Sequence, residues 1–485
     1  MKWLFLKRVV IAFVLITTIF GLAYYNYVTA STGYDGLTRL ANNRKQKTDY
    51  NALFDNSNFK TITVVFDETV FDELLVSMEM YFAQYGTYQD NTLHKVDMIY
   101  HDGLGNDFTI EEVGFRTKSN TSRNLPKTLD WRGRVVYHQT SFQLQFNATF
   151  DYEDTSNEYG VLNNREVFNL DQLNFEFSKS YNAQPDEAMI SEAFSYYLYR
   201  QAGVVTSNVS YGLVYFQIGE DVVGFGFYSF IEPIDSNFLS KHFNSNVIGD
   251  YGDLYKCTDV DGIASLGLDS LNKVGINRNE INLRYNYALK NHQQNGTRTD
   301  FSNIQDLITN IQDQTYFNSH ADNLIDIDAF LRMLAMDFLI GNTDDYRFNG
   351  NNYYLYFDVY TDQVTFIPFD LDNSLGFGKH QDLSGNYGIY YDIFAHTDDI
   401  AILVDRVLAI EAYKSLYLDY LTQYAQDYFL YDSFESDLIQ AKALYETVLI
   451  EENHLGNQVF GLRNAEWYFD LKADSVLNQI AQVRG

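Results

Sequence analysis

A stretch of carboxylate and amide side chains between residues 341 and 379 has the composition of a metal and phosphate site. A mostly apolar segment ends at Gly341, and the loop after it carries Asp344, Asp345, Asn349, Asn351 and Asn352. Two β-type segments follow, and the second ends in Asp370 and Asp372. Mg²⁺ and Mn²⁺ prefer such oxygen ligands and leave positions for water and phosphate. A remaining carboxylate could orient or deprotonate a hydroxyl group.

The two β-type segments, residues 353–357 and 364–368, predict a strand–turn–strand unit whose two ends lie close together. Asp and Asn also cap helices and favour tight turns, so an ordinary turn-rich loop is an alternative interpretation. The order of the residues favours the site. A loop aspartate, a later asparagine, a hairpin and a final aspartate form the layout of the protein-kinase catalytic loop and its metal-binding aspartate.

This stretch resembles the CotH kinases, a family named for a spore-coat protein and related to secretory-pathway kinases with an atypical kinase fold. The resemblance lies in GN-x-D…NNYYLY…IPFDLD-x-S-x-G. Other motifs appear in family order within residues 60–400, namely FRTKSNTSR (115–123), AFSYYLYRQAGV (193–204), VGFGFYSFIEPIDSNFL (223–239) and GDLYK (252–256). The resemblance implies a two-lobed, atypical kinase-like fold that uses ATP with Mg²⁺ or Mn²⁺.

The resemblance also implies roles for individual residues. Asp344 would be the catalytic aspartate that positions the acceptor hydroxyl, and its neighbour Asp345 is a poorer candidate. The residues expected to bind metal are Asn352 or its neighbour Asn351, Asp372 and Asp370.

The loop from Ser119 to Arg123 would cover the nucleotide phosphates, with backbone N–H groups and two basic side chains facing the negative charge. An ordinary polar hairpin tip is the alternative. The residues expected to bind nucleotide are Arg116, Lys118, Ser119, Asn120, Ser122, Arg123, Glu192 as an ion-pair partner of the lysine, and Glu232 in a hinge.

Two departures from the family pattern concern phosphate binding. Ser119 replaces a glycine that would let the backbone approach phosphate closely. The strand QTSFQLQF (139–146) carries Gln139 and Gln143 where the family has lysines. Lys118 could substitute for the missing lysine, or the chain could be a weakened or inactive kinase.

The chain begins with an export signal. Lys2, Lys7 and Arg8 precede an apolar run from residue 9 to residue 25, and Val28-Thr29-Ala30 fits a signal-peptidase site. A cleaved signal and an uncleaved membrane anchor both fit this pattern. We expect residues 1–30 to form the signal or anchor and residues 31–59 a spacer.

The periodicity of the remaining chain predicts an α+β fold with a β-rich half and a helical half. Alternation predicts strands at 95–101, 109–118, 140–150, 209–218 and 222–232, and helical spacing predicts helices at 186–203 and 327–342. We expect residues 60–257 to form a β-rich N-lobe with one helix. Residues 258–400 would form a C-lobe with the catalytic and metal loops, and residues 401–485 its helical end.

Composition excludes several other classes of protein. The chain has 485 residues and a formal net charge of −31, which makes nucleic-acid binding through phosphate neutralisation unlikely. Hydrophobic residues make up 46%, so disorder is excluded. Cys257 is the single cysteine and rules out an internal disulfide framework.

The sequence therefore predicts an exported or membrane-anchored CotH-type kinase. It would transfer the γ-phosphate of ATP to Ser or Thr of an envelope, spore-coat or secreted protein. The negative charge of the chain favours a basic, Ser-rich substrate. The alternatives are a non-catalytic adhesin or scaffold with a kinase fold, and a protein nucleotidyl transferase.

Overall fold

The computed structural model describes residues 49–485, with gaps at 120–122, 178–179, 182–183, 186–187, 246–250, 261, 377–391, 453–454, 456–457, 459 and 461–465. The expected signal or anchor and most of the spacer lie outside the described residues. None of the helices in the described part of the chain is long and apolar enough to cross a bilayer.

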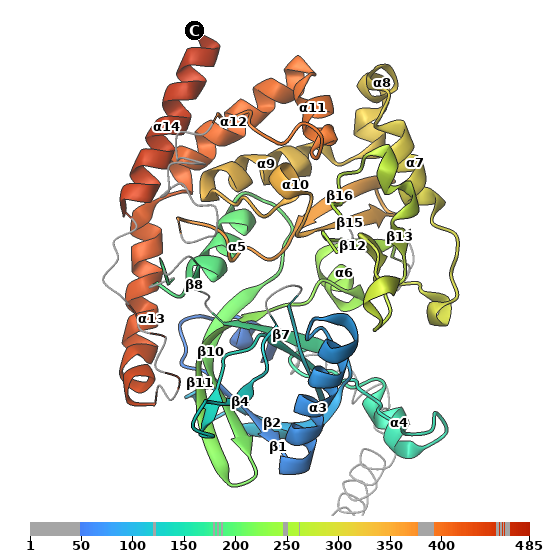
Figure 1. The fold of residues 1–485 in the computed structure, drawn as a ribbon. Coiled ribbons are helices and arrows are strands. Elements are labelled where there is room, and N and C mark those ends of the chain that lie inside the picture. The colour runs from blue at the N-terminus through green and yellow to red at the C-terminus, as the bar shows by residue number, and fades with distance from the viewer. Residues whose placement is uncertain are drawn as a thin grey trace, which may run out of the picture.

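Seven strands form a closed barrel at one end of the molecule (Figure 1). In spatial order they are β1 (Thr61–Phe66), β10 (Val209–Ile218), β11 (Asp221–Ile231), β7 (Gln172–Phe177), β6 (Phe142–Gln145), β3 (Phe108–Thr117) and β2 (His94–His101). Strand β1 runs parallel to β10, and the other neighbours are antiparallel.

The barrel interior is filled by side chains that alternate along each strand. In β1, Ile62, Val64 and Phe66 point inward and are buried. The Phe66 ring contacts Phe115 and Phe216, with centroids 4.9 and 5.2 Å apart. Each such aromatic pair contributes about 0.5–1.5 kcal/mol beyond the burial of its surface. Helix α3 (Glu68–Tyr85) contributes buried apolar residues to this core, and its Phe71 ring lies 5.1 Å from the Phe66 ring.

A second sheet of five strands lies beyond the barrel, among the helices (Figure 1). Its order is β13 (Val274–Gly275), β14 (Tyr287–Leu289), β12 (Leu254–Cys257), β15 (Tyr353–Asp358) and β16 (Gln363–Pro368). Two short hairpins complete the strands, β4 (Lys127–Leu129) with β5 (Val135–Tyr137) and β8 (Ser180–Tyr181) with β9 (Gln184–Pro185).

The remaining helices surround the second sheet or run beside the barrel. They are α4 (Asn157–Leu162), α5 (Ser191–Gln201), α6 (Ser236–His242), α7 (Ser302–Asn310), α8 (Gln314–Leu324), α9 (Ile327–Ile340), α10 (Tyr346–Asn349), α11 (Ile402–Leu408), α12 (Glu411–Asp427), α13 (Tyr431–Glu451) and α14 (Glu466–Arg484). Short 3₁₀ turns occur at Leu268–Asn272, Ile281–Leu283 and Gln294–Gly296.

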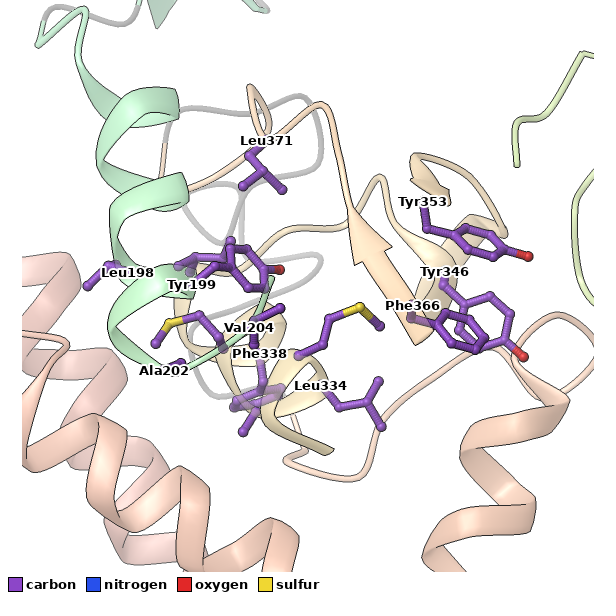
Figure 2. Close-up of a cluster of buried hydrophobic side chains, with 14 of the residues drawn as sticks. Leu198, Tyr199, Ala202, Val204, Leu334, Phe338, Tyr346, Tyr353, Phe366 and Leu371 are labelled. Carbon is purple, nitrogen blue, oxygen red and sulfur yellow. The ribbon is translucent and has the colours of Figure 1, made fainter. Parts of the chain in front are cut away.

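Helix α9 is the centre of the larger core. Asp326 caps its start by accepting a hydrogen bond from the Ala329 amide, and Gly341 ends it in the left-handed conformation. Most of its side chains are buried, between α5, α12 and β16. Figure 2 shows Leu334 and Phe338 of this helix in the same buried cluster as Leu198 of α5. The apolar helix therefore holds the loop that follows it at a fixed place.

Much of the predicted secondary structure is present. Strands β2, β3 and β6 and helices α5 and α9 lie where alternation and helical spacing predicted them, and the fold is a mixture of helices and sheets.

Two expectations were wrong. Residues 60–257 contain four helices, α3 to α6, instead of one. Strand β12 pairs with β14 and β15, so the expected boundary at residue 257 cuts through the second sheet.

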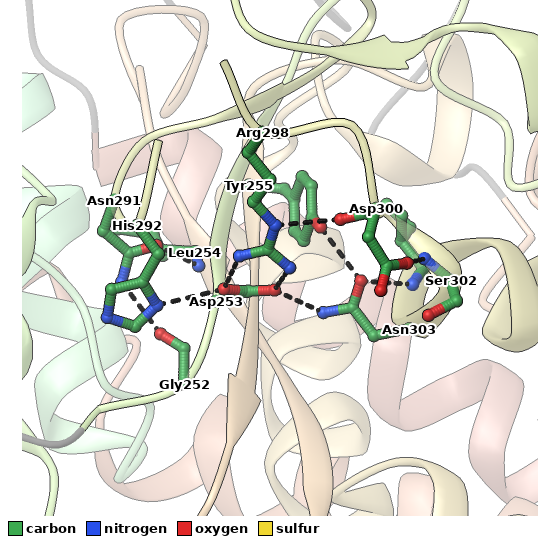
Figure 3. Close-up of polar contacts among 11 residues, drawn as sticks. Gly252, Asp253, Leu254, Tyr255, Asn291, His292, Arg298, Asp300, Ser302 and Asn303 are labelled. Atoms are coloured by element: carbon green, nitrogen blue, oxygen red, sulfur yellow. Dashed lines mark hydrogen bonds and ion pairs between the residues drawn. The ribbon is translucent and has the colours of Figure 1, made fainter. Parts of the chain in front are cut away.

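The first residues of the GDLYK motif serve the architecture (Figure 3). A Cβ atom on Gly252 would lie 1.6 Å from the carbonyl oxygen of Phe357, so only glycine fits there. The buried Asp253 carboxylate accepts two hydrogen bonds from Arg298, at 2.7 and 2.5 Å, and one each from His292 and Asn303. Asp253 thus ties β12 to the loop that leads into α7.

We expect Asp253→Ala to destabilise the protein, because Arg298 and Asn303 lose their shared acceptor. The loss should be roughly 1–3 kcal/mol for each donor left unsatisfied. Urea unfolding of the full chain in detergent measures it. Asp269→Ala, which removes an exposed i,i+4 pair with Lys273, is the control and should change stability by less than about 1 kcal/mol. An equal effect of both substitutions would contradict this role of Asp253.

Candidate active site

The hairpin formed by β15 and β16 brings the asparagine pair next to the aspartate pair. Tyr353 pairs with Pro368 at the end of the ladder, and the Phe369 amide donates to the Asn352 carbonyl oxygen at 3.1 Å. Asn352 and Asp370 both have positive φ angles, 55° and 58°. Asn and Asp adopt left-handed backbone more readily than other non-glycine residues, so both segments can turn at this end of the hairpin.

Asp344 lies in the loop beside this hairpin end. Its Oδ1 atom accepts hydrogen bonds from the side-chain amides of Asn349 and, at 3.1 Å, Asn351. The side-chain amide of Asn352 donates to the Asp344 carbonyl oxygen at 2.9 Å. Within the described part of the chain, Asp344 Oδ2 accepts no hydrogen bond. The loop therefore fixes the carboxylate in orientation and leaves one oxygen available.

Asp345 has a structural role instead. It is 4% exposed and caps α10, where Oδ1 accepts a hydrogen bond from the Phe348 amide. Burial, together with neighbouring Asp337, raises the pKa of the Asp345 carboxyl well above its usual range. The geometry favours Asp344 over Asp345 as the catalytic candidate.

Arg347 anchors the same loop from inside the protein. Its guanidinium is fully buried and donates to the carbonyl oxygens of Ala395 and Ile393 and to the Tyr417 hydroxyl. Carbonyl groups and a phenol satisfy these donors, so the loop is held between α9, α12 and residues 393–395.

The two candidate asparagines differ in what their side chains are bound to. Asn351 uses both ends, because its amide donates to Asp344 and its Oδ1 accepts from the Asp259 amide at 3.1 Å. Asn352 donates to the Asp344 carbonyl, and its Oδ1 takes no hydrogen bond from any described residue. Asn352 is therefore the asparagine with an oxygen available to a cation.

The described residues contain no group of three or more His, Cys, Asp or Glu side chains that could hold a metal ion. Asp370 and Asn352 offer oxygens from adjacent chain segments. The Asp372 carboxylate accepts a hydrogen bond from Asn373 at 2.7 Å. A hard cation with few protein ligands and several phosphate or water oxygens is the usual coordination of Mg²⁺.

Asp370 is held at its backbone, where its amide donates to the buried Tyr196 hydroxyl at 2.9 Å. Burial raises the pKa of Tyr196 well above its usual value, and Glu192, Asp370 and Glu176 raise it further. Three carboxylates thus lie near this hydroxyl, and Tyr196 links α5 to the aspartate segment.

A cavity of about 340 Å³ opens beside Asp370, between the barrel and the second sheet. Among the described residues, seven cationic side chains line it: Arg116, Lys118 and Arg123 from the barrel side, and Lys256, Arg278, Arg284 and Lys290 from the other side. The described lining has two carboxylates, Glu176 and Asp370. In a chain with a net charge of −31, this gathering of positive charge makes the cavity a candidate anion site.

Neutral acceptors hold the arginines of the cavity in place. The side-chain oxygen of Asn91 accepts from Arg123 at 2.9 Å and from Arg116 at 3.4 Å. Arg116 also donates to Gln143 Oε1 at 3.1 Å. Since carbonyl and amide oxygens do not neutralise the guanidinium charges, these side chains are fixed in orientation and remain available to an anion.

Gln143, expected from the sequence at a lysine position, uses both ends of its side chain in hydrogen bonds. It accepts from Arg116 and donates to the Asn174 side chain at 2.8 Å. Gln139 lies before β6, and its side-chain amide donates to the Phe225 carbonyl oxygen at 2.8 Å. The cations of the barrel wall come from β3 and the loop after it, and not from β6.

Lys118 forms an ion pair with Glu176 of β7, with Nζ and Oε1 2.5 Å apart. The expected partner, Glu192, does not line the cavity. The Lys118 and Lys256 ammonium groups lie 5.0 and 4.4 Å from the centroid of the Phe369 ring. Burial and the nearby cations lower the pKa of Lys256 to about 7.

The remaining expected nucleotide-binding residues have varied placements. Ser119 lines the cavity, while Asn120 and Ser122 lie outside the described residues. Glu232 does not line the cavity. Its buried carboxylate accepts hydrogen bonds from His242 at 3.0 Å and from the Asn208 amide at 3.2 Å. A nucleotide role for Glu232 stays a prediction.

Sequence reasoning missed several cavity residues. Lys256 had a signal, because it closes the GDLYK motif, but Glu176, Arg278, Arg284 and Lys290 stand in segments with no recognisable motif. They reach the cavity from β7 and from the loops around β14, and only the pairing of the strands brings them together.

We expect anion binding to weaken as the pH rises from about 6 to about 8, because the Lys256 ammonium loses its proton near pH 7 in the folded protein without ligand. A bound anion favours the protonated form of Lys256. In the unfolded chain the Lys256 pKa is about 10.4. By the same linkage, stability without ligand rises with pH across this range, since the unfolded state binds more protons.

Sulfate keeps its charge over this pH range and is the probe. The thermal shift that it produces should fall with pH in the full-length protein, and the Lys256→Met variant should show a flatter profile. An unchanged slope in the variant would contradict the role of Lys256.

Ser119 has a φ angle of 128°, a backbone conformation that glycine adopts readily. Ser119, expected from the sequence at a glycine position, thus has a backbone conformation that favours glycine. We expect Ser119→Gly to stabilise the protein by about 1 kcal/mol by relieving this strain. Ser119→Ala should give no gain in urea unfolding, and an equal gain from both variants would show that the backbone is not strained.

Comparison with known proteins identifies the family. A family model described as CotH kinase protein matches residues 133–458, more than half of the chain. Among solved structures, a chain in the Shewanella oneidensis MR-1 complex of the HipA–HipB toxin–antitoxin system with its operator DNA is similar, with 14% identity and a TM-score of 0.27. The match covers 64% of this chain and 60% of that chain, less than two thirds of its length. No curated protein matches.

The motif at 115–123 precedes the matched region, and the other four motifs lie inside it. The chain belongs to the CotH kinase family.

Proposed function

We propose that this protein is an ATP-dependent kinase that transfers the γ-phosphoryl group of ATP to Ser or Thr hydroxyls of an envelope, spore-coat or secreted protein. The observation that carries the proposal is the cationic cavity beside Asp370, at the same hairpin end that holds the Asp344 loop. The barrel with α3 would be the N-lobe of an atypical kinase fold, and the second sheet with its helices would be the C-lobe.

The cavity side chains would bind the phosphates. Lys118, oriented by its ion pair with Glu176, corresponds in chemistry to the lysine–glutamate pair that protein kinases use on the nucleotide phosphates. Arg116 and Arg123 present planar groups of donors that suit phosphate oxygens. A buried cavity with a large positive excess and neutral support for its arginines is stabilised by a polyanion.

Asp344 would receive the proton of the acceptor hydroxyl. Its Oδ1 is fixed by two amide donors, and Oδ2 accepts no hydrogen bond from the described residues. Phosphoryl transfer requires mainly that the hydroxyl be oriented in line with the phosphorus, and a carboxylate held in this way can do so.

Asn352 Oδ1 and the Asp370 carboxylate, with Asp372 nearby in sequence, are the side chains that would hold Mg²⁺ or Mn²⁺. A bound cation would neutralise the negative charge that the transferred phosphoryl group develops. The protein supplies few ligands, so phosphate oxygens and water would complete the coordination.

The substrate and the cellular location are further parts of the proposal. A net charge of −31 favours basic substrates, so a Ser-rich basic protein is the proposed acceptor. The basic residues before the apolar run at 9–25 support export, either as a membrane-anchored protein or as a secreted one.

The full chain, purified in detergent with Mg²⁺ or Mn²⁺ and γ-labelled ATP, should label itself or a Ser-rich basic peptide. We expect Asp344→Asn to lower the rate by roughly 10²- to 10⁴-fold, because the acceptor hydroxyl loses its base. Asp362→Asn is the matched control, since Asp362 is an exposed turn residue whose positive φ angle asparagine tolerates. An unchanged rate in Asp344→Asn would remove Asp344 from the catalytic role.

The same assay separates the alternative functions. Incorporation of label from the α-phosphate of ATP would replace phosphorylation with nucleotidyl transfer. A full chain that no nucleotide stabilises in a thermal-shift scan, with or without metal, would favour the adhesin or scaffold, since ligand binding to the folded state must raise stability.

A further inference from the structure

The lining of the cationic cavity is mostly polar. The sixteen described residues that line it comprise seven cations, two carboxylates, five neutral polar residues and two apolar residues, Val260 and Phe369. Pockets that hold an organic ligand are lined mostly by hydrophobic and aromatic groups, with a few polar groups that set orientation. This cavity has the opposite composition.

The one aromatic ring among the described lining residues is largely covered. Phe369 is 5% exposed, and the ammonium groups of Lys118 and Lys256 lie 5.0 and 4.4 Å from its centroid. The buried ring therefore presents little surface on which a purine could stack. The described lining thus offers neither a stacking surface nor an apolar slot for a base.

The positive charge extends along the cavity in two groups. Lys118 and Lys256 gather around Phe369 and Asp370 at the end that faces the hairpin. The second group gathers around the loop at residues 89–91, where Arg123 donates to the Asp90 carbonyl and Arg284 to the Gln89 carbonyl at 2.8 Å.

Arg284 extends the second group with the same kind of support. It donates to the side-chain oxygen of Gln89 and to the Tyr81 hydroxyl at 3.2 Å. Arg123 and Arg116 share Asn91 in the same region. Seven cations against two carboxylates among the described lining residues fit a ligand that carries several negative charges along a chain.

We propose that this site recognises a linear chain of phosphates without contacts to a nucleobase, so that GTP and inorganic tripolyphosphate bind as ATP does. The inference rests on the proposed function, because it specifies the donor of the same site. The chemical class of ligand is a polyphosphate, with or without a nucleoside at one end.

Calorimetric titration of the full chain in detergent with Mg²⁺ tests the proposal, with ATP, GTP, inorganic tripolyphosphate and adenosine as the ligands. We expect the first three dissociation constants to agree within about threefold, a difference of less than about 1 kcal/mol, and adenosine not to bind. Tripolyphosphate that binds tenfold or more weaker than ATP, or adenosine that binds, would overturn the inference and leave the kinase proposal standing. Failure of all four ligands to bind would overturn the kinase proposal itself.

Variants in the second group of cations give an independent readout. Arg284→Gln should weaken ATP, GTP and tripolyphosphate by a common factor of roughly tenfold or more, because it removes a charge-assisted contact to phosphate. Arg134→Gln, in an exposed hairpin pair, is the control and should change none of them. A loss for ATP alone would indicate a contact with the base and contradict the proposal.

Discussion

Positive charge held inside a strongly acidic protein is the constraint on which the arrangement of this site depends. Burial and mutual repulsion lower the pKa of Lys256 to about 7, and burial and a nearby arginine lower that of Arg116 to about 10. Such a cluster opposes folding unless other interactions fix each side chain. These interactions are hydrogen bonds to neutral acceptors, the ion pair between Lys118 and Glu176, and the contacts of Lys118 and Lys256 with the Phe369 ring. The result is a cationic cavity whose two walls come from the barrel and from the second sheet.

Gln143 of β6 supports the cationic cavity without carrying a charge. Gln143 cannot supply charge, but it connects Arg116 to Asn174 and so orients a cation on the adjacent strand. Strand β3 pairs with β6 in a register that sets Arg116 opposite Gln143. A lysine at that residue would add a charge close to Arg116 and repel it. The glutamine therefore orients Arg116, and arginine and lysine side chains from β3 and the loop after it carry the charge of this wall.

The polar residues of the loop after α9 fall into two groups, those that hold the loop in place and those of the candidate active site. Asp345 and Arg347 point into the protein, where they cap α10 and hold residues 393–395. Asp344 and Asn352 remain near the end of the hairpin, oriented by their neighbours. The rigid apolar helix before the loop and the hairpin after it make this division possible, because both ends of the loop are fixed.

The sequence by itself determined the family, the mixture of helices and strands, and the proximity of Asn352 to Asp370. Local patterns carry these features: alternation, helical spacing, turn chemistry and motif order act over a few residues. Tertiary structure decided which residues share the cavity. Glu176, Lys256, Arg284 and Lys290 are separated by long stretches of chain, and only strand pairing between distant segments brings them beside Lys118. It also gave the two neighbouring aspartates different surroundings, since Asp345 is buried and caps α10 while Asp344 accepts hydrogen bonds from asparagine side chains.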